Sequence, residues 1–139
     1  MLFRSVLKLE TDAGMQTRLF HFSATAQAAP GERTWQGFSV AEWDQPRRSG
    51  GPSPGGTLKV VTTNLKPGYL RKNGVPYGQK AIVTEYFNHT PETYGITYMI
   101  VTTIVEDPDY LFGPFVTSSH FKKLPGAANG WHPTPCSVR

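Results

Sequence analysis

The sequence predicts an all-β domain, an antiparallel meander of six to seven strands that forms a barrel or a strongly curved half-barrel. Short runs rich in Val, Ile, Thr and aromatic residues recur along the 139-residue chain, a composition typical of strands. The 14 glycines and 12 prolines, many of them in clusters, predict frequent turns. No segment of useful length has helical periodicity. Because sequential strands with one apolar face must close on themselves or be covered, a curled sheet is the simplest outcome.

The chain opens with a predicted hairpin. Residues 6–10 and 16–22 are short β-like runs, and Asp12, Ala13 and Gly14 between them have the residue types of a turn. Residues 23–34 are small, polar and rich in turn formers, so we expect a loop there.

The next two strands are predicted over residues 35–43 and 57–64. Strand alternation places five residues on one face of the first strand, namely Trp35, Gly37, Ser39, Ala41 and Trp43. Neither face is clearly polar, so we expect this strand to be covered on both sides or to curve at Gly37. The Gly- and Pro-rich residues 44–56 predict a loop, and the two strands should pair as a long hairpin.

A fourteen-residue connection follows at 65–78, with a turn at Asn73-Gly74. Ordered connections of this length are uncommon and often functional. Residues 81–87 and 94–106 then predict a third hairpin, because both are rich in β-branched and aromatic residues. The last strand is predicted over 115–123, before a Gly- and Pro-rich tail.

Length and charge limit the classes of protein that fit. We expect a single β domain over residues 1–139. The net charge of +4 is spread along the chain, which argues against a nucleic-acid-binding face. No apolar run is long enough for a transmembrane helix, and no signal peptide is visible.

The single cysteine, Cys136, cannot form an internal disulfide, and we interpret it as a buried, inert or merely unpaired thiol.

Residues 2–5 read as a translated sequencing adaptor. We therefore expect the chain to be the C-terminal part of a longer protein.

Sequence patterns typical of catalysis are weak. The four histidines are far apart in the sequence, so no local metal motif is present and we predict no metal or other cofactor. Glu42, Glu85 and Glu106 lie within or at the end of strands, and an inward carboxylate could act as a general acid or base. We favour the alternative that these carboxylates are exposed cross-strand partners of Lys59, Lys80 or Arg18. We predict no catalytic residue.

The candidate binding residues are aromatic and basic. The stretch at 66–77 combines two tyrosines with cations, which suits an anionic or aromatic group, although its glycines fit plain turns equally well. Aromatic residues in or beside the strands could line a cavity, but core filling is the interpretation we favour. The candidates are Tyr69, Arg71, Lys72, Tyr77, Trp43, Tyr86 and Tyr98.

Several motifs carry a resemblance that covers about residues 7–136. The most distinctive are WQGFSVAEW at 35–43, GYLRKNGVPY at 68–77 and TIVEDPDYL at 103–111. In order and spacing the chain resembles a family of uncharacterised bacterial proteins, many of them exported. The resemblance implies a periplasmic or extracellular location and a longer N-terminus, but no activity, cofactor or site residue.

Three functions fit these observations. The first is a non-enzymatic, exported domain that binds a small apolar or aromatic molecule, or a partner, at the barrel mouth and the 66–77 loop. The second is a small hydrolase or isomerase that uses an inward Glu with a nearby His. The third is a structural module of an envelope protein, and an open sheet edge would favour a homodimer.

Overall fold

The computed structural model describes residues 5–22, 32–44, 56–72, 74–91, 94–126 and 130–137. Residues 1–4, most of the 23–34 and 44–56 loops, and Asn73 of the expected turn lie outside the described residues. The described part of the chain contains no helix with the length and apolar character needed to cross a membrane.

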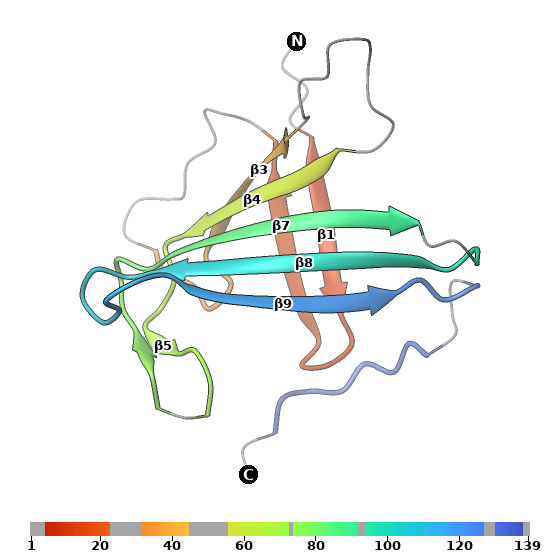
Figure 1. The fold of residues 1–139 in the computed structure, drawn as a ribbon. Helices are drawn as coiled ribbons and strands as arrows, with labels where there is room; N and C mark the ends of the chain where they lie inside the picture. The colour runs from red at the N-terminus through yellow and green to blue at the C-terminus, as the bar shows by residue number, and fades with distance from the viewer. Residues whose placement is uncertain are drawn as a thin grey trace, which may run out of the picture.

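The fold is all-β, as the sequence predicts. One seven-stranded sheet curls into a half-barrel, with β1 and β2 crossing behind β7, β8 and β9 (Figure 1). Its strands, in sheet order, are β1 (Val6–Thr11), β2 (Gln16–His21), β3 (Phe38–Asp44), β4 (Thr57–Thr63), β7 (Ile82–Pro91), β8 (Thr97–Glu106) and β9 (Phe115–Lys122). A separate two-stranded sheet holds β5 (Gly68–Tyr69) and β6 (Pro76–Tyr77).

The sheet departs from an antiparallel meander at one junction. Strands β2 and β3 are parallel and pair only through Phe20 with Ser39 and His21 with Val40, whereas all other neighbouring strands are antiparallel. Parallel neighbours need a long crossover instead of a tight turn, and residues 22–37 supply it. Both predicted long hairpins, β3 with β4 and β7 with β8, are confirmed.

The first of these strands starts later than predicted. Trp35 lies in a turn before β3, in which the Gly37 amide donates to the Thr34 carbonyl at 3.3 Å. Gly37 has φ +65°, and a Cβ there would collide with the Thr63 carbonyl oxygen. Glycine is therefore required where the chain enters the sheet. Likewise, Gly95 at φ +76° sits in a turn, so β8 begins at Thr97.

The core lies on the concave face of the half-barrel. Along β4 every second residue is buried, so Leu58, Val60 and Thr62 face inward. Phe20 from β2 and Ala41 from β3 pack against this row, and Leu9, Phe22 and Phe87 cover its margin. The strand period read from the sequence thus decides which side chains form the interior.

The C-terminal tail returns to the first hairpin. Thr134 bridges Ala13, with its amide donating to the Asp12 carbonyl at 2.9 Å and its carbonyl accepting from the Gly14 amide at 2.8 Å. Cys136 lies beside this turn and its thiol is exposed and unpaired, so the buried alternative is wrong.

Candidate functional site

A cleft of about 310 Å³ opens on the concave face, between the β1–β2 hairpin and strands β7, β8 and β9. This volume is at the lower end of the range for small-molecule sites. Its apolar wall consists of Leu9, Phe87, Met99, Val101 and Phe121. Its polar groups come from Glu10, Thr11, Arg18, Glu85, Thr103 and Ser119.

Strand register explains why these side chains converge. Glu85 and Phe87 lie two residues apart on β7, so both point to the concave face. Their partners on β8 are Thr103 and Val101, and directly paired residues of antiparallel strands share a face. Ser119 on β9 pairs with Val101 and extends the same row. The cleft floor is thus three strands wide.

An ion pair between Arg18 and Glu85 crosses the cleft. The Arg18 Nη1 donates to Glu85 Oε1 at 3.0 Å, and Nη2 donates to Oε2, which makes the contact bidentate. The two side chains are only 17% and 10% exposed. Arg18 lies on β2 and Glu85 on β7, and these two strands are not neighbours in the sheet. The ion pair therefore ties the two walls of the half-barrel together.

Further contacts hold the guanidinium in place. Arg18 Nη2 lies 3.4 Å from the Thr62 hydroxyl, which shares a 2.7 Å hydrogen bond with buried Ser39. The guanidinium carbon also lies 4.9 Å from the centre of the Phe20 ring, within reach of a cation–π interaction. The charges are therefore compensated, and the cleft presents a fixed polar group within an apolar wall.

The cleft is open because the sheet does not close. Strands β1 and β9 are its two edges. Leu7 on β1 and Phe121 on β9 are about half exposed, although Leu7 pairs with buried Phe20 and Phe121 lines the cleft. An apolar interior that reaches solvent along an open seam is a place where a ligand can replace water.

The candidate binding residues named from the sequence lie elsewhere. Tyr69, Arg71, Lys72 and Tyr77 share the arm that carries β5 and β6 at one end of the sheet, where Tyr77 contacts Gly68. None of these four lines the cleft. The structure brings these four residues together but keeps them apart from the other three candidates.

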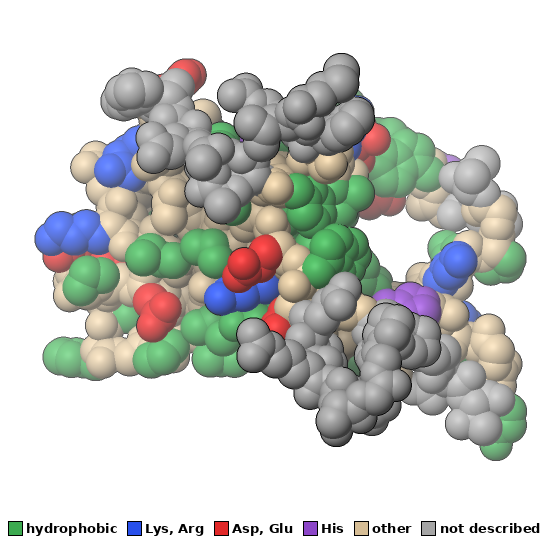
Figure 2. All heavy atoms as spheres, turned by 90° about the horizontal axis from the view of Figure 1, so that it is seen from above, with side chains coloured by type: hydrophobic (Ala, Val, Ile, Leu, Met, Phe, Trp, Pro, Cys, Tyr) green, Lys and Arg blue, Asp and Glu red, His purple; other side chains and the backbone are tan. Residues whose placement is uncertain are grey.

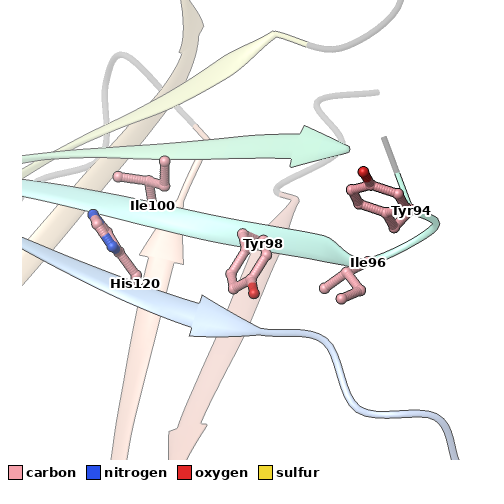
Figure 3. A pocket seen from close by; sticks show the side chains of 5 residues that line it. All are labelled: Tyr94, Ile96, Tyr98, Ile100 and His120. Atoms are coloured by element: carbon pink, nitrogen blue, oxygen red, sulfur yellow. The ribbon is translucent and has the colours of Figure 1, made fainter. Parts of the chain in front are cut away.

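The other three candidates occupy two regions. Trp43 is the penultimate residue of β3, stacks on Phe22 with 6.2 Å between ring centres, and is largely exposed. Tyr86 and Tyr98 point to the convex face, because they alternate with the inward residues of β7 and β8. Tyr98 lies in a shallow hollow of about 510 Å³ with Tyr94, Ile96, Ile100 and His120 (Figure 3). That hollow is more open than the cleft, so it encloses a ligand less well.

Among the described residues that line the cleft, Glu10 and Glu85 are carboxylates and none is a histidine. His89 is on the same strand as Glu85 but four residues away, which corresponds to about 13 Å along a strand. Glu42 points outward, 3.7 Å from Lys59, and is one of the cross-strand partners that the sequence suggested. Within the described ranges, no three His, Cys, Asp or Glu side chains gather as a metal site would require.

Comparison with known proteins gives no match to a family model, a curated protein or a solved structure. The resemblance to exported bacterial proteins therefore stays a prediction.

Sequence reasoning named Arg18 as a possible partner of Glu85, but it placed such pairs on the surface. A signal for burial was present, because Arg18 shares its strand face with Phe20 and Phe22. A charge among apolar residues on one face predicts an inward partner.

Proposed function

We propose that this domain binds a small, mostly apolar molecule with one polar group in the concave cleft, without catalysing a reaction. The observation that carries the proposal is the open apolar cleft beside the compensated Arg18–Glu85 pair. A ligand that fills the seam would bury Leu9, Met99 and Phe121, and each buried side chain favours binding through the hydrophobic effect.

The polar groups suggest how the ligand is oriented. Thr103 and Ser119 offer hydroxyls that both donate and accept hydrogen bonds. The carboxylate of Glu85 already accepts two hydrogen bonds from Arg18, yet each oxygen retains a free lone pair. A hydroxyl or amide on the ligand can therefore bond here without displacing the ion pair.

Two neighbouring serines on β9 allow a matched test. Ser119 faces the cleft, and Ser118 faces the convex side of the same strand. The probe is anilinonaphthalene sulfonate, an aromatic dye that fluoresces in apolar sites. We expect saturable binding to the wild type, at least tenfold weaker binding to Ser119→Trp, and unchanged binding to Ser118→Trp. Circular dichroism and thermal unfolding check that both variants fold.

Equal loss in both variants, or no saturable binding to the wild type, would contradict the proposal. Binding should also stabilise the fold, by about 2.7 kcal/mol when the free dye is 100 times its Kd. A saturating dye that leaves the melting temperature unchanged would therefore count against a site in the folded domain.

Export and homodimer formation remain predictions. The free edges of β1 and β9 favour strand pairing with a second copy, because their outer backbone groups have no neighbouring strand in the described sheet. Light scattering coupled to size-exclusion chromatography measures the oligomeric state directly. A monomer at all concentrations would rule out the edge-paired dimer.

A further inference from the structure

Three segments meet at one end of the half-barrel, at the left of Figure 1. We define this loop end by residues 34–37, 64–72, 74–81 and 107–114, which lie between strands β3, β4, β7, β8 and β9 on the same side. The cleft does not include any of these residues. The loop end is therefore a second surface, separate from the proposed ligand site.

The loop end is firmly built. The carboxylate of buried Asp107 accepts hydrogen bonds from the Gly78 amide at 2.6 Å and from the Asp109 amide at 2.9 Å. Lys80 pairs with Asp109 at 2.9 Å, and the Tyr110 ring lies against Gly78. These bonds fix the turn between β8 and β9 to the arm that carries β5 and β6. The backbone that carries the projecting side chains is thus held in place before any partner arrives.

Those projecting side chains include large aromatic rings. Phe112 is fully exposed at the tip of the β8–β9 turn, and Tyr69 on β5 is 70% exposed. Trp35 and Tyr110 are also more than half exposed. Trp and Tyr have an apolar ring with a polar tip, which suits the boundary between membrane and water.

Three cations at this end have no carboxylate partner among the described residues. Lys66 lies 5.6 Å from the centre of the Trp35 ring, and the Arg71 guanidinium lies 5.2 Å from that of Phe115. Lys72, the residue after Arg71, is also exposed. The four ion pairs among the described residues leave all three of these cations unpaired. Figure 2 keeps this end on the left and shows Lys and Arg side chains there beside hydrophobic and acidic ones.

We propose that the loop end docks on the surface of an anionic membrane, with Phe112 inserted between the lipids and Lys66, Arg71 and Lys72 at the headgroups. Exposed apolar tips flanked by cations are typical of proteins that lie on membranes. Phe112 and Tyr69 protrude from two different segments. A membrane accepts such tips without a preformed pocket, whereas a protein partner would need a matching cavity for each.

Flotation with phospholipid vesicles tests the apolar part of this surface. We expect the full chain to float with vesicles of phosphatidylcholine mixed with phosphatidylglycerol. Phe112→Ser should weaken this partition at least tenfold. Tyr94→Ser is the matched control, because Tyr94 is 91% exposed but lies in the β7–β8 hairpin at the opposite end of the sheet. Equal loss in the two variants would overturn the assignment of the loop end.

Charge variants test the electrostatic part. Each cation at an anionic surface contributes about fivefold in partition, so Lys72→Gln should lower binding by about that factor. Lys123→Gln, which removes an exposed cation at the opposite end, should leave it unchanged. Binding should fall in high salt and on vesicles of phosphatidylcholine alone. Failure of the wild type to float with anionic vesicles, or flotation equal on both vesicle types, would overturn the proposal.

Discussion

Removal of one partner of the Arg18–Glu85 pair should destabilise the half-barrel more than removal of both. The Glu85→Leu variant removes the carboxylate that pairs with the Arg18 guanidinium. Of the polar contacts described above for this guanidinium, only the one with the Thr62 hydroxyl then remains. Breaking a fully buried ion pair by removing one partner costs about 3–5 kcal/mol of stability. Because the side chains of Arg18 and Glu85 are 17% and 10% exposed, we expect Glu85→Leu to lower the free energy of unfolding by about 2–3 kcal/mol. For a domain of this size that is roughly a 10 °C fall in melting temperature.

The double variant Arg18→Met, Glu85→Leu removes both charges and keeps most of the apolar volume. We expect it to lie within about 1 kcal/mol of the wild type, because two well-packed apolar side chains replace an ion pair without leaving a buried charge. Equilibrium urea unfolding of the wild type, the two single variants and the double variant gives the coupling free energy, which we expect to be about 2 kcal/mol or more.

The surface pair of Glu42 and Lys59 is the matched control. Glu42 is 71% exposed and 3.7 Å from Lys59, so Glu42→Leu should change the free energy of unfolding by less than about 1 kcal/mol. Our reasoning would be refuted if Glu85→Leu cost no more than Glu42→Leu. It would also be refuted if the double variant lost the sum of its two single changes.

Three further changes have predicted outcomes. Asp107→Ala leaves two backbone N–H groups without their acceptor and should cost about 2–4 kcal/mol in urea unfolding; no measurable change would contradict the anchoring role. Gly37→Ala should lower the melting temperature more than Gly74→Ala, because both have positive φ but only Gly37 lacks room for a Cβ. The Asp109 carboxylate, through its hydrogen bond and its charge, raises the pKa of Lys80 above 10.5. The stability from this pair is therefore fully present below pH 10.5 and lost as the pH rises through the raised pKa, so the unfolding midpoints of wild type and Lys80→Gln should converge there.

The strands were predictable because their signal is local. Residues 57–64 are rich in β-branched side chains, which favour a strand, and burial along β4 alternates with the strand period of two. The strand starts predicted at Trp35 and Tyr94 were wrong, because a glycine with positive φ follows each of these residues and the strand begins only after it. The short β5 and β6 strands pair through only two residues each, which is too little sequence to show a period.

The parallel pairing of β2 and β3 was missed although the sequence carries a signal for it. The connection from 22 to 37 is far longer than a hairpin turn, and such lengths are typical of crossovers. The candidate binding residues were chosen for their chemistry alone. Composition cannot say whether a tyrosine points to the concave face or to the convex one, and both Tyr86 and Tyr98 point to the convex one.

By itself the sequence determined that this chain folds as a curled β sheet, because strand periodicity and turn residues act over a few neighbouring positions. Only the tertiary structure decided that Arg18 reaches Glu85, that the sheet stays open between β1 and β9, and that exposed rings gather at the loop end. These features depend on the direction and curvature of strands distant in the sequence. Small differences in twist and pairing accumulate over the whole sheet, so no local pattern specifies them.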